Sequence, residues 1–250
     1  MGRALIEVCV DSMESAREAV RGGADRLELC ANLIIGGTTP SPYLIREAAA
    51  LGVPVHVLIR PRFGDFLFTE DEKREQLESI AQLQALGAKG AVVGALLPDG
   101  SLDVEFLKAC REAAQSLHLT LHRAFDVCRD AEEALEQACG IGFDTILTSG
   151  QKATAQEGAE LIAKLVLQAG SRVMIMPGSG VNARNIAQLH AWTGAQAFHL
   201  SAKKKAESGM VYRKEGVPMG LPMMNEFERF CTDAGAVAAA RAALEERQVE

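Results

Sequence analysis

Residues 5–30, LIEVCVDSMESAREAVRGGADRLELC, contain two short apolar runs separated by one amphipathic run. The apolar runs Leu5–Val10 and Arg26–Cys30 have the length and composition of buried strands, and Ser12–Arg21 has helical periodicity. Gly22 and Gly23 follow the amphipathic run, as glycines do where a helix ends. The stretch therefore predicts a strand, a crossover helix and a second, parallel strand.

The same alternation continues along the rest of the chain. Further strands are predicted at Val53–Arg60, Ala91–Leu96, Leu119–Ala124, Thr145–Ser149, Val173–Pro177 and Ala197–Ser201. Further helices are predicted at Pro42–Leu51, Thr69–Leu86, Leu102–Ser116, Ala131–Cys139, Thr154–Gln168, Asn182–Ala191 and Asn225–Glu246. Repeated strand–helix units of this kind favour a parallel sheet with crossover helices.

The number of units indicates how the sheet closes. Eight units in 250 residues, with no linker or change of composition, predict an α/β fold in which residues 1–250 form a single (β/α)8 barrel of the TIM type. An open doubly wound sheet is the alternative, but no GxGxxG sequence follows the first strand, so we expect no nucleotide cofactor. The Gly- and Pro-rich stretch Lys203–Met224 predicts a long irregular loop after strand eight, at the end of a barrel where functional loops lie.

The composition disfavours several classes of partner. The chain has 33 acidic and 26 basic residues, a net charge of -7, and its longest basic run is Lys203–Lys205, which argues against nucleic acid. No run approaches about 20 apolar residues, and Glu7 interrupts the apolar start too early for a signal peptide. We therefore expect a cytoplasmic protein with no membrane partner.

The cysteines give no sign of a disulfide framework or a zinc motif. Six are scattered along the chain with no CxxC pair: Cys9, Cys30, Cys110, Cys128, Cys139 and Cys231. In a reducing compartment we expect free thiols, most of them small core residues.

Two strands place an acid and a thiol on the same face. Glu7 and Cys9 in the first strand, and Glu28 and Cys30 in the second, are two residues apart and so share a side of the sheet. If that side faces the barrel interior, two carboxylates and two thiols line it. The alternative is that these acids only anchor an arginine such as Arg26. The same alternation places His56 on one face with Arg60, Thr120 with His122, and His199 with Ser201.

Arginines and a histidine follow the third and fifth strands. Arg60 and Arg62, one proline apart, predict a clamp for a phosphate or carboxylate, to which Arg123 adds a third cation; internal pairing with Asp65 or Glu28 is the alternative. His122 with Asp126 on the following turn suits general acid–base chemistry, because histidine titrates near neutral pH and a carboxylate in contact with the imidazole can fix its tautomer.

Small residues follow the last three strands. Ser149, Gly178, Ser179, Gly180 and Ser201 lie at strand ends where barrels commonly bind phosphate with backbone N–H groups. The segment Gly36–Ser41 could form another anion nest, but a turn into a helix capped by Ser41 with Pro42 at its first position is favoured.

These strand ends together closely resemble those of the CutC copper homeostasis family. The resemblance runs from about residue 5 to residue 235 and is carried by Val8–Ser12 with Glu14–Ala16, and by Gly22–Cys30, Gly36–Ser41, Ile59–Arg62 with Gly64–Phe66, His122–Asp126 and Leu147–Lys152. Thr38, Phe63 and Phe68 depart from the family pattern. The resemblance implies a cytoplasmic, homo-oligomeric TIM-type barrel that handles copper, with Cys9 and Cys30 as the Cu(I) ligands.

Two functions remain open at this point. Copper homeostasis is the first, because Cu(I) prefers soft ligands such as thiolates. The second is a barrel enzyme that acts on a small anionic, for example phosphorylated, metabolite. In that hypothesis Glu7, Glu28, His122 and Asp126 perform acid–base chemistry, and the anion is bound by Arg60, Arg62, Arg123, Ser149, Gly178, Ser179, Gly180 and Ser201. A purely structural role is the weakest option, because unpaired charge inside a barrel is costly.

Overall fold

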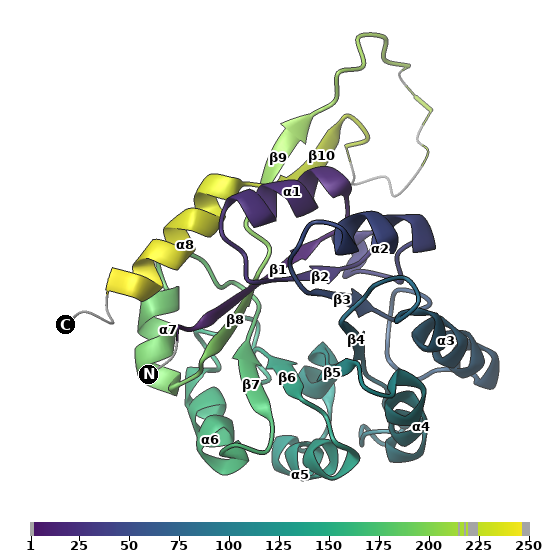
Figure 1. Cartoon of the computed structure of the whole chain (residues 1–250), viewed down its shortest axis with the longest axis vertical. Coiled ribbons are helices and arrows are strands. Elements are labelled where there is room, and N and C mark those ends of the chain that lie inside the picture. The colour runs from purple at the N-terminus through teal and green to yellow at the C-terminus, as the bar shows by residue number, and fades with distance from the viewer. Residues whose placement is uncertain (1–2, 215, 218, 220–224, 247–250) are drawn as a thin grey trace.

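A closed parallel barrel dominates the computed structural model, which describes residues 3–214, 216–217, 219 and 225–246. The barrel strands are β1 (Leu5–Val10), β2 (Arg26–Leu29), β3 (Val55–Leu58), β4 (Gly90–Val93), β5 (His118–Leu121), β6 (Thr145–Thr148), β7 (Met174–Pro177) and β8 (Ala197–Leu200). They are hydrogen-bonded in the order β7-β6-β5-β4-β3-β2-β1-β8, and β7 and β8 lie side by side to complete the ring (Figure 1). The prediction of a TIM-type barrel is confirmed.

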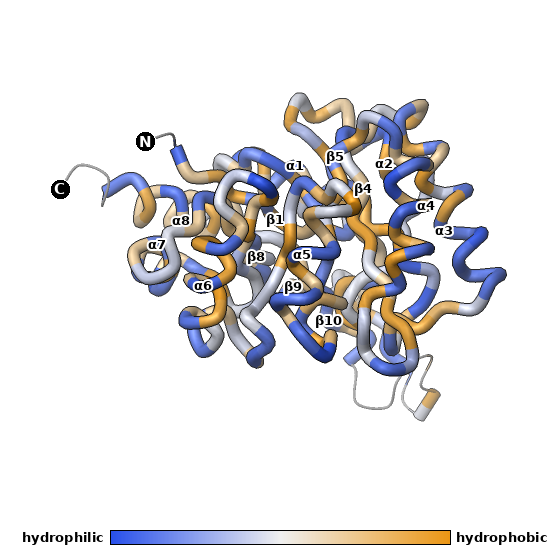
Figure 2. Tube along the Cα trace, turned by 90° about the horizontal axis from the view of Figure 1, so that it is seen from below, coloured by the Kyte–Doolittle hydropathy of each residue, from blue (hydrophilic) through white to orange (hydrophobic). Residues whose placement is uncertain are grey.

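A ring of helices surrounds these strands (Figure 1). They are α1 (Met13–Arg21), α2 (Pro42–Ala49), α3 (Glu70–Gln82), α4 (Val104–Ala114), α5 (Ala131–Ile141), α6 (Ala159–Ala169), α7 (Ile186–Thr193) and α8 (Ala234–Glu246). Two short 3-10 helices, η1 (Leu33–Ile35) and η2 (Arg123–Val127), follow β2 and β5. Hydrophilic and hydrophobic residues alternate along the outer helices, as expected of elements with one buried face (Figure 2).

The helix starts follow from local sequence. The Ser41 side chain accepts a hydrogen bond from the Leu44 N–H at 3.3 Å, and Pro42 occupies the first turn of α2. The turn favoured for Gly36–Ser41 is therefore present. Thr69 and Glu72 form a reciprocal capping box that begins α3.

Two regions of core differ in chemistry. The large apolar core lies between strands and helices and includes Ile6, Leu29 and Phe198. Inside the barrel, by contrast, apolar residues form only small clusters, one around Cys30 and Leu58 and another around Met176, Leu147 and Ala197. Charged and polar side chains occupy much of the remaining interior, which sets the position of the candidate site.

The segment after β8 differs from the prediction. Lys203–Glu207, expected to be irregular, form strand β9, which pairs antiparallel with β10 (Glu228–Thr232). The helix predicted at Asn225–Glu246 consequently begins only at Ala234. Cross-strand contacts such as the Lys205–Glu228 ion pair at 2.8 Å explain the change, because they form only once the two segments meet. The hairpin projects beyond the barrel beside α1 (Figure 1). Part of the predicted loop lies outside the described residues.

Candidate functional site at the interior of the barrel mouth

The predicted acids and thiols of β1 and β2 face the interior. In the strand register Glu7 lies opposite Arg26 on one side and His199 on the other, and Cys9 lies opposite Glu28. All are buried except His199, which is partly buried. The alternation of side chains along β1 and β2, together with the pairing of β1 with β8, therefore brings carboxylates, a guanidinium and an imidazole together inside the barrel.

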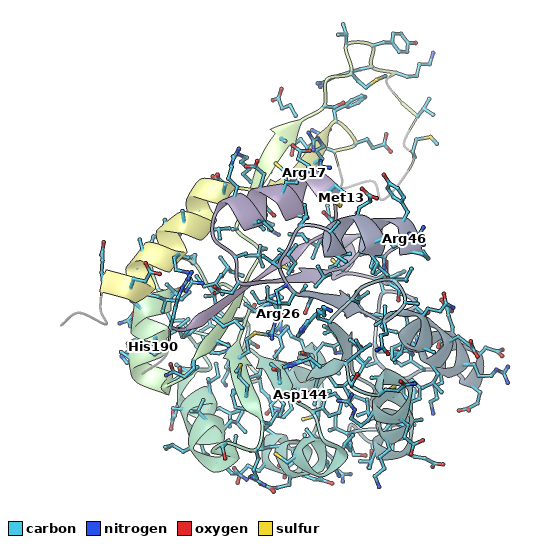
Figure 3. The ribbon with its side chains drawn as sticks, viewed as in Figure 1. Met13, Arg17, Arg26, Arg46, Asp144 and His190 are labelled. Carbon is cyan, nitrogen blue, oxygen red and sulfur yellow. The ribbon has the colours of Figure 1, made fainter. Side chains whose placement is uncertain are left out.

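Glu7 is held between two cationic groups. Arg26 donates from Nε to Glu7 Oε2 at 2.5 Å, and His199 donates from Nδ1 to Glu7 Oε1 at 2.8 Å. Burial raises the pKa of Glu7, but Arg26 and His199 outweigh it and hold that pKa well below its usual range. Figure 3 shows Arg26 in the centre of the ring of strands. The alternative in which an interior acid anchors Arg26 is thus realised by Glu7.

Glu28 has a different environment. Its Oε2 atom is buried without a hydrogen-bond partner and lies 4.0 Å from His199 Nδ1. Burial raises the pKa of Glu28 to about 7; the charge of Glu7 adds to this effect, while His199 and Arg26 oppose it. Glu28 is therefore balanced between its acid and carboxylate forms near neutral pH.

His199 joins the cluster from the far end of the chain. Burial lowers its pKa, but Cys9, Glu28 and Glu7 raise it well above the ordinary value, and Cys9 and Glu7 do so partly through hydrogen bonds to the ring. The sequence pattern marks this histidine by its spacing from Ser201, and it is not one of the catalytic, anion-binding or metal-ligand residues predicted above. One ligand atom from each of Glu7, Glu28 and His199 lies within 4.8 Å of the other two, which is close enough to hold a metal ion.

The two candidate copper ligands differ in accessibility. Cys9 lines a pocket of about 560 Å³ together with Ser201, residues of the β2–α2 loop and residues of the β9–β10 hairpin. Cys30 is fully buried, and its thiol donates to the Val10 carbonyl at 3.5 Å. Burial, with smaller contributions from Cys9 and Glu28, raises the pKa of Cys30 far above its usual range.

The two arginines of the predicted anion clamp donate hydrogen bonds to other groups of the protein. Arg60 donates to the carbonyl oxygens of Gly36, Gly37 and Gly64 at 3.3, 3.1 and 2.6 Å, although its Nε atom has no partner. Arg62 donates to Glu72 at 2.6 Å and to Asp65 at 3.2 Å. Both guanidiniums therefore organise loops, and for Arg62 the internal pairing with Asp65 is realised.

The expected contact between His122 and Asp126 does not form. Asp126 accepts hydrogen bonds from Arg123, from the Ser149 N–H and from the Thr148 hydroxyl. His122 Nδ1 instead accepts from the Ala124 N–H at 3.1 Å, and its Nε2 atom is buried without a partner. Burial, assisted by the charge of Arg60, lowers the pKa of His122 to about 3. The expected pairing fails because the turn after β5 directs Asp126 toward the β6 loop.

The predicted phosphate loops contact neighbouring loops. Ser179 donates to the Ala153 carbonyl at 2.8 Å, and Gly180 accepts from Asn182 and Asn185. The Ser149 hydroxyl is bonded to Asp126 and to the Lys152 carbonyl. Anion binding by Gly178, Ser179, Gly180, Ser149 and Ser201 stays a prediction.

Comparison with known proteins gives the family. The CutC family model matches residues 4–204. The chain belongs to the CutC family. A protein of Parabacteroides distasonis named CutC is 49% identical over 232 residues, covering 92% of this chain and 96% of that protein. The Homo sapiens protein named copper homeostasis protein cutC homolog is 43% identical over 231 residues, covering 92% of this chain and 85% of that protein.

Solved structures agree with this assignment. The structure of a CutC protein from Streptococcus agalactiae superposes with a TM-score of 0.75 at 34% identity, covering 78% of this chain and 97% of that chain. Thiamine phosphate pyrophosphorylase from Pyrococcus furiosus superposes with a TM-score of 0.59 at 17% identity, which shows only a shared fold. Among the described residues, no helix is long and apolar enough to span a bilayer.

Proposed function

We propose that the chain binds Cu(I) through Cys9 and Cys30 as part of copper homeostasis. The observation that carries the proposal is the placement of two thiols on the interior side of neighbouring strands, one of them at the wall of a pocket. Cu(I) selects soft ligands, and thiolate is the softest that a protein offers. The name of the human relative supports the same function.

Cys9 would be the point of entry in this proposal. It lines the pocket, whereas Cys30 lies deeper and its thiol must lose a proton before it can coordinate. A bound metal displaces the proton of a coordinating thiol. The raised pKa of Cys30 therefore lowers the apparent affinity of this thiol for the metal at a given pH, but it does not exclude coordination.

The nearby arginines would not repel the ion strongly. Arg26 is neutralised by Glu7 at 2.5 Å, and Arg60 is surrounded by carbonyl oxygens. Their positive charge is therefore largely compensated where the thiols lie.

An anaerobic titration of Cu(I) against a chelator of known affinity tests the proposal. The wild-type chain should bind stoichiometrically, and the double variant Cys9→Ser, Cys30→Ser should lose at least about tenfold in affinity. Cys139→Ser is the matched control, because Cys139 is a partly exposed thiol outside the barrel interior. Equal affinity of wild type and the double variant would overturn the proposal.

Localisation and assembly belong to the same proposal. We expect a cytoplasmic homo-oligomer, as the resemblance to the family implies. Trp192 is 51% exposed on α7 and offers apolar surface for an interface. Sedimentation of the wild type and of a Trp192→Glu variant would show whether this surface is used.

A second candidate function is a barrel enzyme acting on a small anionic metabolite. It is favoured by Glu28, whose pKa of about 7 suits a general acid or base, next to His199. The Cys9 pocket offers space for a substrate, while Arg60 and Arg62 are already engaged by the protein. Binding of inorganic phosphate that is weakened by Gly180→Ala would support this candidate, and equal binding by both proteins would count against it.

A further inference from the structure

We propose that Glu7, Glu28 and His199 form a binding site for one divalent cation of the Zn²⁺ class inside the barrel. Its ligands are other residues than the thiol pair, and the site does not rest on the proposed copper function. Its three ligands come from β1, β2 and β8, which are adjacent strands of the barrel.

The first argument is an unsatisfied carboxylate oxygen. Glu28 is 7% exposed, and its Oε2 atom has no hydrogen-bond partner although it faces the imidazole of His199. A buried carboxylate oxygen without a partner is costly, and such a group in a native structure calls for an ion or water. A cation between Glu28, Glu7 and His199 would satisfy it.

The distances suit such a cation. Bonds from Zn²⁺ to nitrogen and oxygen are about 2.1 Å long, so tetrahedral ligand atoms lie about 3.4 Å apart. His199 Nδ1 lies 2.8 Å from Glu7 Oε1 and 4.0 Å from Glu28 Oε2. Both distances are within about 1 Å of the tetrahedral value. The ligand oxygens of Glu7 and Glu28 lie within 4.8 Å of each other, and rotation of these side chains would bring the three ligands to the tetrahedral spacing.

The surrounding charges favour a cation. Arg26 bonds Glu7 Oε2, which fixes the orientation of the carboxylate, while Oε1 faces the cluster and accepts from His199 Nδ1. Metal binding must displace the proton of His199 and the proton that part of Glu28 carries; two carboxylates and one guanidinium then leave excess negative charge around the cation. The cation would take the place of the proton that His199 now donates to Glu7.

The ligand types distinguish this site from a copper(I) or magnesium site. Imidazole with two carboxylates is a common set for Zn²⁺, while Cu(I) prefers thiolates and Mg²⁺ prefers six oxygens. Three protein ligands leave one position open, as in catalytic zinc sites. Cys9 hydrogen-bonds to His199 and lines the pocket, so it connects this cluster with the pocket.

Titration of the full chain with Zn²⁺ against a chromophoric chelator, under anaerobic conditions, tests the proposal. The variant Glu28→Gln keeps the shape of the side chain and should bind Zn²⁺ at least about tenfold more weakly than wild type. His199→Gln should do the same. Glu136→Gln, which alters an exposed acid paired with Arg172, is the surface control and should bind like wild type.

The single variant Cys30→Ser separates this site from the copper proposal, because the Cys30 thiol donates to the Val10 carbonyl and is not one of the three ligands. It should keep its Zn²⁺ affinity and bind Cu(I) more weakly, whereas Glu28→Gln should lose Zn²⁺ and keep Cu(I). Unchanged Zn²⁺ affinity in a folded Glu28→Gln variant would overturn the zinc site, whatever the copper result. Circular dichroism establishes that each variant is folded, and Co²⁺ in place of Zn²⁺ should give the visible absorption of a tetrahedral site in wild type and not in Glu28→Gln.

Discussion

Arg26 Nε and Glu7 Oε2 are 2.5 Å apart, and both side chains are almost completely removed from solvent. The two residues occupy paired positions of β1 and β2, so the parallel register itself sets the contact. A buried ion pair adds little net stability, but removal of one partner leaves an uncompensated charge in the interior.

Arg26→Met should therefore destabilise the chain by about 3–5 kcal/mol, because Glu7 loses its guanidinium partner. The double variant Glu7→Gln, Arg26→Met should be more stable than Arg26→Met alone, since the unpaired charge is gone. Urea unfolding followed by circular dichroism measures both free energies. An equal loss in the single and double variants would show that packing, rather than charge, dominates at this position.

Glu28 should make the chain less stable as pH rises. Burial raises its pKa to about 7 in the folded chain, against 4.5 for the ordinary group, so the folded state holds the proton more tightly. Stability from this group is complete below about pH 4.5, falls as pH rises to about 7 and then stays level, a loss on the order of a few kcal/mol. Glu28→Gln should remove this dependence, as unfolding free energies between pH 4.5 and 8 would reveal; an unaltered pH profile would contradict the assignment.

Two buried histidines should make the chain less stable as pH falls. Burial lowers the pKa values of His56 and His122 to about 3, so both are neutral in the folded chain while the unfolded chain takes up protons below about pH 6.5. Their contribution to stability is complete above about pH 6.5 and is lost progressively toward pH 3. The loss of stability on acidification, measured as the difference in melting temperature between pH 7.5 and pH 5, should be smaller in His122→Gln than in wild type. The same drop in melting temperature in wild type and in His122→Gln would exclude His122 as a cause of the acid destabilisation.

Gly94 makes room for His122. A Cβ atom at position 94 would lie 2.5 Å from the imidazole and 3.0 Å from the Ala124 Cβ atom. Gly94→Ala should therefore destabilise the chain by about 1–3 kcal/mol through overpacking. Gly140→Ala is the matched control, because a Cβ atom there meets nothing within 4 Å and alanine favours the helix by up to about 1 kcal/mol. Thermal unfolding of both variants should give a lower melting temperature for Gly94→Ala than for Gly140→Ala, and equal melting temperatures would contradict the steric argument.

Much of the fold follows from local sequence. The alternation of apolar and amphipathic runs predicts all eight barrel strands, because burial on both faces demands continuous apolar runs. The prediction is wrong after β8, where Lys203–Glu207 and Glu228–Thr232 pair across 20 intervening residues. Such a ladder depends on cross-strand contacts that no local window contains.

For the candidate site, too, the sequence predicts one part and the tertiary structure decides the rest. The two-residue period predicts, from sequence alone, that Glu7 shares a face of β1 with Cys9 and that Glu28 shares a face of β2 with Cys30, because successive side chains in a strand alternate. Only the closed barrel decides which partners they meet. His199 bonds Glu7 across 192 residues because β8 lies beside β1, and the guanidiniums of Arg60 and Arg62 donate to loop carbonyls and to Glu72. The sequence by itself thus determines which groups of a strand share a face, whereas the arrangement of the strands into a ring and the loop paths, which are long-range packing effects, decide which face lies inside, how those groups pair and which ligand they can hold.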